Sequence, residues 1–280
     1  VKDELTWQAS LQLGLGLRDS ATRLRRCRHR GPLYVQKAFY PEGPELAHLY
    51  LLHPPGGVVS GDQLRIDIDL DAGAHGLVTT PGAARIYRAR DQLPLQQQSV
   101  RLCLAEQASL EWFPLETIVY DGACVELDTT VELAPNSHFV GWELTCFGLP
   151  ASGEPFQRGS FRQRYRVMQD GLPAFIEQFE VTTDSVERML HGSALLRGEP
   201  VTGLFIAGPL ATSLSDDEVK ALRDSTAVTG ADLSQVGAFM VGRYLGASAE
   251  QGRRAFTAWW SLLRPRMLGR PACSPRIWLT

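Results

Sequence analysis

The chain has 280 residues and a formal net charge of −3, with 44% hydrophobic and 21% charged residues. This is the composition of an ordinary soluble globular protein, and the length suits one large β domain or two average ones. No basic field covers the whole protein and no apolar run reaches the ~20 residues of a spanning helix, so neither nucleic acid nor membrane is expected as a partner. The five cysteines form no C-x-x-C pair, which indicates reduced thiols in a cytoplasmic protein.

The first distinctive segment is 23–30, which contains five arginines within eight residues. Such a segment is typical of an edge strand that is protected from aggregation by its charge. It is also compatible with a docking stripe for an acidic protein partner. Because no aromatic side chain alternates with the arginines, binding of nucleic acid is not expected here.

Two corners rich in proline and glycine follow, at 53–62 (HPPGGVVSGD) and 79–88 (TTPGAARIYR). Proline fixes φ and glycine permits positive φ, so both segments predict sharp turns. Between them, 64–70 alternates apolar and polar residues and predicts a half-buried strand. Neither corner has the spacing of a P-loop or of the dinucleotide-binding glycine motif, which argues against a nucleotide site.

Short strands continue to about residue 210, with period-two alternation at 99–104 and 125–133. Three segments, 70–78, 104–112 and 133–142, share one plan: a leucine closes a strand, a short polar turn follows, and an apolar residue opens the next strand. This echo predicts a stacked or coiled β architecture. No alternation of strands with helices is present, so a doubly wound parallel sheet is not expected.

The first of two predicted helices begins at a capping box, Ser215 to Glu218, which Leu214 and Val219 flank as a hydrophobic staple. The pattern predicts a helix over about 215–226.

A second box at Ser248 predicts a helix over about 248–264, which Pro265 should end or kink. Its apolar stripe is typical of a helix that packs on the protein's own sheet. Because the stripe includes Trp259 and Trp260, part of it is also a candidate partner contact. We therefore predict a single domain over 1–280, strand-rich over 7–210, with two helices packed on the sheets.

Motifs of enzymes and tight metal sites are absent from the sequence. There is no G-x-S-x-G elbow and no H-E-x-x-H pair, and the histidines are scattered. His48 and His53 should point to opposite faces of one strand, so they are not expected to chelate one ion together.

Three acidic residues stand in unusual surroundings. Glu143 and Glu177 lie in otherwise apolar strand patterns, and Asp62 closes the first corner. A buried carboxylate needs a partner, a proton or water. Local pairing would satisfy them, with Arg65, Arg85, Arg88 or Lys37 as candidates, and Asp62 has a simple alternative role in the turn. The other interpretation is a hydrated internal passage, where carboxylates hold a divalent cation weakly and exchange it quickly.

The two corners, together with the blocks 31–43, 48–53, 110–114 and 275–280, resemble the UreD (UreH) family of urease accessory proteins. The resemblance implies an elongated, mostly β fold whose strands wind in a helix-like manner, with two helices. It implies a scaffold rather than an enzyme, with no tightly bound cofactor and with nickel in transit. The partners it implies are UreF-like and UreG-like proteins and the urease apoprotein.

The resemblance also suggests roles for residues. Asp62, Glu143 and Glu177 match acidic positions of the family and are the first candidates for nickel contacts, with His53 and Cys146 as weaker ones. Candidate partner contacts are Arg85, Tyr87, Arg88, Trp259 and Trp260. Two other hypotheses remain open: an all-β hydrolase that uses paired carboxylates, and a passive adaptor that conducts no metal.

Overall fold

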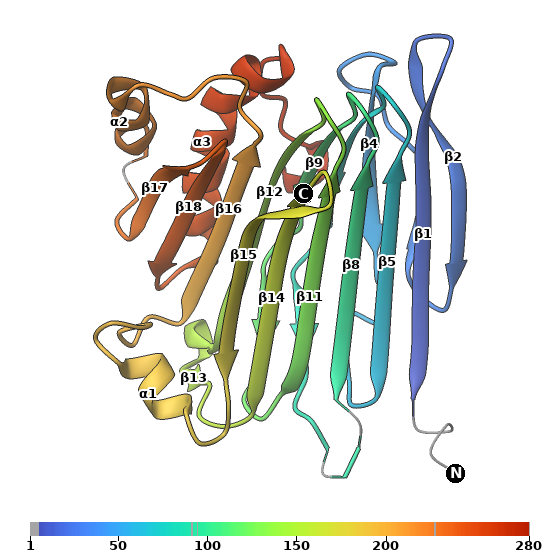
Figure 1. The fold of residues 1–280 in the computed structure, drawn as a ribbon. Helices are drawn as coiled ribbons and strands as arrows, with labels where there is room; N and C mark the ends of the chain where they lie inside the picture. The colour runs from blue at the N-terminus through green and yellow to red at the C-terminus, as the bar shows by residue number, and fades with distance from the viewer. Residues whose placement is uncertain (1–5, 91, 94, 227, 280) are drawn as a thin grey trace.

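The computed structural model describes residues 6–90, 92–93, 95–226 and 228–279. Two large β-sheets lie face to face, and a long helix near the C-terminus covers the outer face of one of them (Figure 1). The mostly β fold predicted from the sequence is confirmed.

The first sheet has seven strands in the order β15-β14-β11-β8-β5-β1-β2. Five of them are parallel to one another, and β2 and β15 are antiparallel strands at the two edges. The bounds are β1 (Trp7–Arg18), β2 (Ala21–Arg30), β5 (Asp62–Leu70), β8 (Gln96–Leu104), β11 (Cys124–Leu133), β14 (Ser160–Gln169) and β15 (Leu172–Val181).

The second sheet has eleven strands, and its main path is β17-β18-β16-β12-β9-β6-β4-β3. Within it β4, β6, β9 and β12 are parallel, and β16, β18 and β17 follow as an antiparallel extension. The bounds are β3 (Tyr34–Val35), β4 (Leu46–Leu52), β6 (His75–Thr79), β7 (Ala84–Ile86), β9 (Ser109–Phe113), β10 (Thr117–Val119), β12 (His138–Leu149), β13 (Glu154–Pro155), β16 (Val201–Gly208), β17 (Ala231–Val236) and β18 (Phe239–Gly246).

From β4 to β14 the chain winds between the two sheets, because β4, β6, β9 and β12 belong to one and β5, β8, β11 and β14 to the other. The turns after β5, β8 and β11 stack on one another through backbone hydrogen bonds. The amide of Ser109 donates to the carbonyl of Ala74 and the amide of His138 to that of Ala108, both at 2.9 Å. These are the three segments that share one plan in the sequence, so the predicted stacked, β-helix-like winding is confirmed.

The main core lies between the sheets and follows the period-two alternation of the strands. In β5, Leu64, Ile66 and Ile68 are buried in this core, whereas Arg65 is on the outer face. Because fully burying an aliphatic side chain contributes about 1.5–3 kcal/mol, the repeated apolar face of each strand supplies the main driving force for stacking.

The described residues contain the α-helices α1 (Val186–His191), α2 (Asp216–Asp224) and α3 (Ala249–Leu268), and 3-10 turns at Pro150–Ser152 and Arg276–Leu279. The predicted capping box of α2 is present, since Ser215 and Glu218 exchange side-chain and backbone hydrogen bonds. α2 ends at Asp224, two residues before the predicted end. We did not predict α1 or the β17–β18 hairpin. No helix in the described part of the chain is long and apolar enough to cross a membrane.

α3 begins as predicted, with Ser248 as its N-cap, but it does not end at residue 264, before Pro265, as predicted. The helix continues to Leu268 and stops at Gly269, whose φ of 63° is left-handed and whose amide donates to the carbonyl of Pro265. Pro265 lies in the last turn, where it removes only one internal amide donor. The preceding residue, Arg264, anchors the same turn through buried ion pairs that are described below.

The apolar stripe of α3 packs on the outer face of the eleven-stranded sheet, as predicted. Trp259 and Trp260 are both 0% exposed, so neither ring offers a surface to a partner, and we withdraw them as candidate contacts. Glycines of the sheet make room for the aromatic rings: a Cβ at Gly242 would overlap the ring of Trp259, and one at Gly203 would lie 2.8 Å from the ring of Phe256.

Candidate functional site

A cavity of about 330 Å³ lies between the two sheets. Most of its walls are apolar side chains of both sheets. Because Pro81, Gly82 and Arg85 line the cavity and are themselves exposed, it reaches the surface at the loop 80–85. Its polar lining groups include His53, Gln98, Thr129, Glu143 and Gln163.

Among the described residues that line this cavity, Glu143 is the only one with a carboxylate. It extends from β12 towards the facing sheet, where its oxygens accept hydrogen bonds from Thr129 Oγ1 at 2.6 Å and Gln163 Nε2 at 2.5 Å. Burial raises the pKa of Glu143 to about 7, although these two hydrogen bonds oppose the rise; the charge of Asp128 adds to it. No lysine or arginine of the described chain forms an ion pair with Glu143, so its charge remains available to a cation.

Glu177 also lies between the two sheets, but outside the lining of the cavity and nearer the edge of the sandwich, on the edge strand β15. It stands opposite Tyr165 in β14 and forms an ion pair with Arg243 of the other sheet, two strands from Glu143. With strands about 4.8 Å apart, the pair is roughly 10 Å from Glu143. The buried hydroxyl of Tyr165 has no hydrogen-bond partner among the described residues, and burial together with the charge of Glu143 raises its pKa well above the usual range.

Asp62 and His53 form a separate pair of groups at the first corner. Asp62 is buried, and its Oδ2 accepts a hydrogen bond from the amide of Val59 at 2.9 Å, so it holds the turn. It does not line the cavity. His53 does line it, and its Nε2 is buried without a hydrogen-bond partner in the described chain. Burial lowers the pKa of His53, and the charge of Asp62 opposes this effect.

Cys146 is separated from these groups. It is buried among the apolar residues beneath α3, whereas Glu143, an odd number of positions away on β12, points into the space between the sheets. Burial raises the pKa of the Cys146 thiol to about 11, which disfavours the thiolate that binds metal. The structure therefore corrects the prediction that Cys146 shares a site with the acids.

Of the basic and aromatic residues of the second corner, Arg85 lines the cavity, and Tyr87 and Arg88 follow it in the chain. Arg85 and Arg88 are exposed, and neither forms an ion pair with a described residue. Tyr87 is half-buried, with its ring packed on Gly57 and 5.1 Å from the ring of Tyr120. Both arginines are thus free to contact a partner, which stays a prediction.

The local pairings that we considered for the three acids are not formed. Arg65 pairs with Asp67 at 2.8 Å, and the cation that reaches Glu177 is Arg243, which no sequence pattern indicated. In the described part of the chain, no group of three or more histidine, cysteine, aspartate or glutamate side chains is arranged to hold a metal ion tightly. Of the predicted site residues, the fold brings Glu143 and His53 together as lining residues of the cavity. Glu177 and Asp62 do not line it, and Cys146 lies beneath α3.

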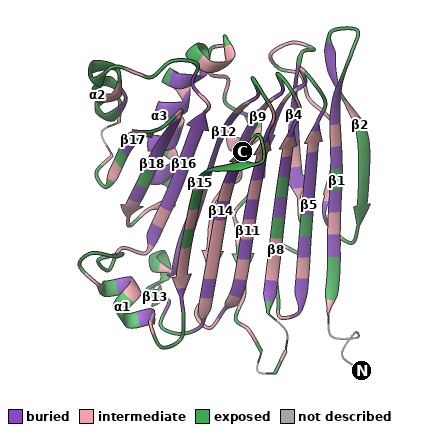
Figure 2. Ribbon diagram, in the orientation of Figure 1, coloured by how far each residue is buried: buried purple, intermediate pink, exposed green. Residues whose placement is uncertain are grey.

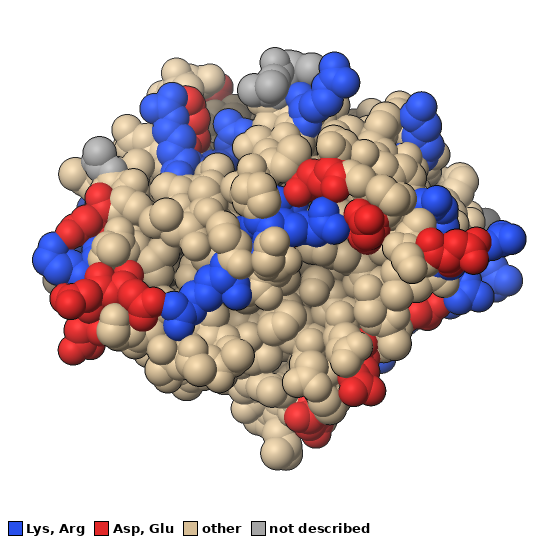
Figure 3. All heavy atoms as spheres, turned by 90° about the horizontal axis from the view of Figure 1, so that it is seen from above, with Lys and Arg blue, Asp and Glu red and all other residues tan. Residues whose placement is uncertain are grey.

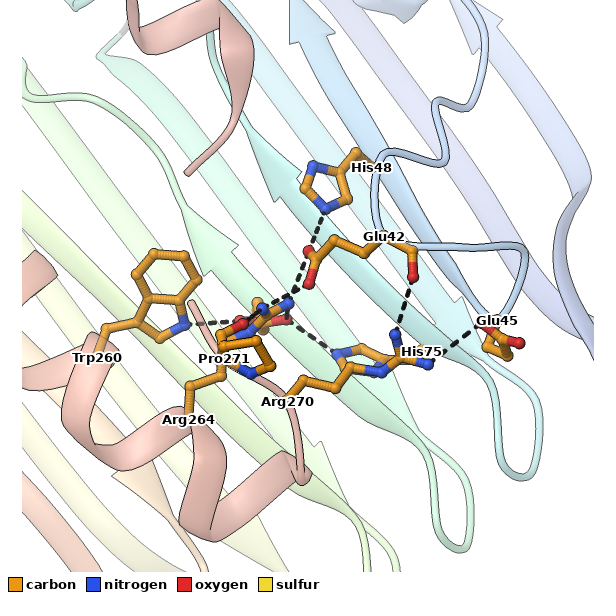
Figure 4. A network of polar contacts seen from close by, with 9 residues as sticks. Glu42, Glu45, His48, His75, Trp260, Arg264, Arg270 and Pro271 are labelled. Carbon is orange, nitrogen blue, oxygen red and sulfur yellow. Dashed lines mark hydrogen bonds and ion pairs between the residues drawn. The ribbon is translucent and has the colours of Figure 1, made fainter. Parts of the chain in front are cut away.

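A second polar cluster, which we did not predict, lies on the other face of the eleven-stranded sheet (Figure 4). Arg264 of α3 is 0% exposed and forms ion pairs with Glu42 at 2.6 Å and Glu111 at 2.9 Å. His48 contacts Glu42 at 2.8 Å and His75 contacts Glu111 at 3.0 Å. A further hydrogen bond to Glu111 comes from the indole of Trp260.

This cluster is arranged to hold two carboxylates in their charged form. Burial by itself raises the pKa of Glu42, but hydrogen bonds from His48 and Arg264 outweigh it and hold the pKa at about 2. In the same way His75 and Arg264 outweigh burial and lower the pKa of Glu111. The cluster therefore fixes α3 and the segment after it to the sheet, and its role is structural. The one sequence signal for it is Glu111, an acid within the apolar run 110–114.

Comparison with known proteins shows the family of the chain. The model of the family described as "UreD urease accessory protein" matches residues 8–279. The chain belongs to the UreD family. Curated relatives, each named urease accessory protein UreD, include those of Marinomonas sp. (strain MWYL1), 43% identical over 98% of this chain and 90% of the relative, and Azoarcus sp. (strain BH72), 42% identical over 98% and 94%.

A third relative, from Dechloromonas aromatica (strain RCB), is 40% identical over 98% of this chain and 95% of its own length. Because the UreD match extends over nearly the whole chain, both the cavity and the Arg264 cluster lie within it. Membership of this family implies a role in urease maturation.

Proposed function

We propose that this member of the UreD family is a non-enzymatic scaffold of the cytoplasm that joins apo-urease to UreF-like and UreG-like partners and lets nickel pass through its interior. Nickel is the cargo here, and no cofactor is required. The observation that carries the proposal is Glu143. It is a carboxylate in a cavity that reaches the surface, and the described residues give it hydrogen-bond donors but no ion pair.

The passage that we propose runs between the two sheets. It begins at the loop 80–85, where the cavity reaches the surface, passes His53 and Glu143, and ends at the edge where Glu177 meets Arg243. Oxygen ligands exchange divalent cations quickly, whereas a cage of cysteine and histidine would retain nickel. A path lined by single carboxylates therefore attracts the ion without trapping it. The ion pair of Glu177 would have to open for the ion to leave at this edge.

Catalysis by paired carboxylates is a weaker interpretation. Glycoside hydrolysis requires two carboxyl groups about 5–10 Å apart across one bond. Among the described lining residues the cavity has only Glu143, and Glu177 is already paired with Arg243. The exposed Arg85 at the mouth of the cavity and the exposed Arg88 that follows it suit a protein partner instead, because arginine is favoured at interfaces.

Nickel activation of urease tests the proposal. Glu143→Gln and Glu177→Gln would be compared with Glu180→Gln, a control on β15 whose side chain pairs with Arg162 at 3.0 Å. All three variants would be purified together with partner proteins and apo-urease, and assembly would be measured separately from activation. We expect normal assembly in all three, with strongly reduced nickel activation for the first two.

Full activation by both Glu143→Gln and Glu177→Gln would favour the alternative hypothesis, that the protein is a passive adaptor that conducts no metal. Failure of the purified scaffold to assemble with any urease component would refute the proposal as a whole.

A further inference from the structure

Strand β2 forms an unusually open edge of the seven-stranded sheet. It has ten residues and pairs only with β1 in the described chain. Thr22 at its start donates to the carbonyl of Pro44, but from Arg23 to Arg30 the outer edge has no backbone partner among the described residues. Figure 2 shows this strand exposed over most of its length. The backbone groups of this segment are thus available to a further strand.

All the charged side chains of β2 itself are arginines, so the strand carries positive charge only. Arg26, Arg28 and Arg30 share the outer face of the sheet, because they stand opposite Gly14, Gln12 and Ser10 of β1. Alternate residues of a strand are roughly 7 Å apart, so the three side chains leave the strand at regular intervals on this face.

Only part of this charge is neutralised inside the protein. Arg26 pairs with Asp69, and the neighbouring Arg25 pairs with Asp71 at 2.9 Å. Arg28 and Arg30 form no ion pair with a described residue. In the view from above, basic side chains with acidic ones beside them gather on the side of the molecule where β1 and β2 lie (Figure 3). The end of β2 at Arg28 and Arg30 therefore carries positive charge that no ion pair with a described residue neutralises.

Charge on an edge strand is a common protection against aggregation. A row of one sign repels basic and apolar strands, but it favours an acidic one, because opposite charges on neighbouring strands contribute about 0.2–1 kcal/mol for each pair. Addition of a strand to a free edge is also an established way for a sheet to bind an extended peptide. Both properties select the same kind of partner.

We propose that β2 is a docking strand for an acidic, extended polypeptide segment, which adds to its free edge and places carboxylates against Arg28 and Arg30. The partner is a protein rather than a nucleic acid, since β2 contains no tyrosine, tryptophan or phenylalanine on which bases would stack. This inference rests on the edge alone. It is independent of the cavity and of nickel transfer.

Binding of a defined peptide tests the proposal on the full chain. The probe is a fluorescein-labelled peptide of alternating glutamate and threonine with the length of β2, and the reference probes replace glutamate by glutamine or by lysine. Affinity is measured by fluorescence anisotropy at low ionic strength, where charge contacts are least screened. Amide hydrogen exchange of residues 23–30 reports whether the peptide adds as a strand.

The variant is Arg28→Glu with Arg30→Glu. Its control is Arg188→Glu with Arg254→Glu, which changes the net charge equally at exposed helical positions far from β2 in the sequence. We expect the β2 variant to bind the glutamate peptide at least about tenfold more weakly and to bind the lysine peptide in its place. The control should stay within about twofold of the wild-type affinity. In the wild-type protein the glutamate peptide should slow exchange in 23–30 and leave β15 unchanged.

Three results would overturn the proposal. The first is equal loss of affinity in the β2 variant and in the control, or no binding to the wild-type protein. The second is binding without slower exchange in residues 23–30, which would mean that charge is recognised but no strand is added. The third is a labelled oligo-thymidylate that binds β2 as tightly as the glutamate peptide, which would assign the surface to nucleic acid.

Discussion

The substitution Glu143→Gln offers the sharpest test of how the cavity works. The glutamine has almost the same shape as the glutamate but cannot carry a charge. Thr129 can still donate to its carbonyl, and a flip of the Gln163 amide lets that side chain accept from the new NH₂ group. The change therefore removes the charge and leaves the hydrogen bonds largely in place.

The expected effect depends on pH. Burial raises the pKa of Glu143 to about 7 from an ordinary value of 4.5, and each unit corresponds to about 1.4 kcal/mol. Between these two values the folded protein binds more protons at this site than the unfolded chain, so wild-type stability falls as pH rises. The penalty is absent below pH 4.5 and reaches about 3 kcal/mol above pH 7. The glutamine variant lacks this penalty.

Urea denaturation of the wild-type protein and the variant, across the range from acidic to mildly alkaline pH, measures this difference. We expect similar stabilities at the acidic end and a variant that is more stable by up to about 3 kcal/mol at the alkaline end. Glu180→Gln, on the outer face, should not change the pH dependence. Parallel pH profiles for the wild-type protein and Glu143→Gln would refute the reasoning, because they would mean that Glu143 is not held in a low-dielectric site.

Three further predictions concern the packing of α3. Arg264→Gln leaves Glu42 and Glu111 buried without their cation. Urea denaturation at neutral pH should show a free energy of unfolding that is lower by about 3–5 kcal/mol. The control Arg254→Gln, on the exposed face of α3, should change it by less than about 1 kcal/mol. Because the pKa of Glu42 is held at about 2, the free energy of unfolding of the wild-type protein should also fall as pH drops from about 4.5 towards 2. In Arg264→Gln it should fall less steeply with pH, and equal slopes in the two proteins would contradict this explanation. Gly242→Ala pushes a methyl group against Trp259 and should cost about 1–3 kcal/mol in thermal unfolding, while Gly82→Ala, with open space around its Cβ, should be neutral.

The β-rich part of the fold was predictable because its signals are local. Alternation in 64–70 and 125–133 sets the buried face of each strand, and the shared plan of the three turns follows from their stacking. The caps of α2 and α3 are also local, since each uses residues three positions apart. The end of α3 was not predicted in this way, because the helix continues through Pro265 to a left-handed cap at Gly269. The ion pairs of the neighbouring Arg264 join residues more than 150 positions apart, which no local pattern contains.

The candidate site was predictable only in part, for the same physical reason. An acid in an apolar strand pattern indicated Glu143 and Glu177, but the pattern does not contain the partner. Arg243 reaches Glu177 from another sheet, and Arg264 reaches Glu111 across 153 positions of the sequence. Asp62 looked similar in sequence, yet its partner is the amide of Val59 in its own turn.

Glu111 and Glu143 show how one residue type acquires two roles in one sheet. They come from the neighbouring strands β9 and β12 and point to opposite faces. On the outer face Arg264 and His75 reach Glu111 and lower its pKa, so that its negative charge is balanced by side chains of the protein itself. On the inner face the donors that reach Glu143 from described residues are the neutral Thr129 and Gln163, and its pKa rises to about 7. A carboxylate that destabilises the fold when it is charged is one that an incoming cation stabilises. The stability that Glu143→Gln is expected to restore and the nickel activation that it is expected to remove thus have the same physical origin.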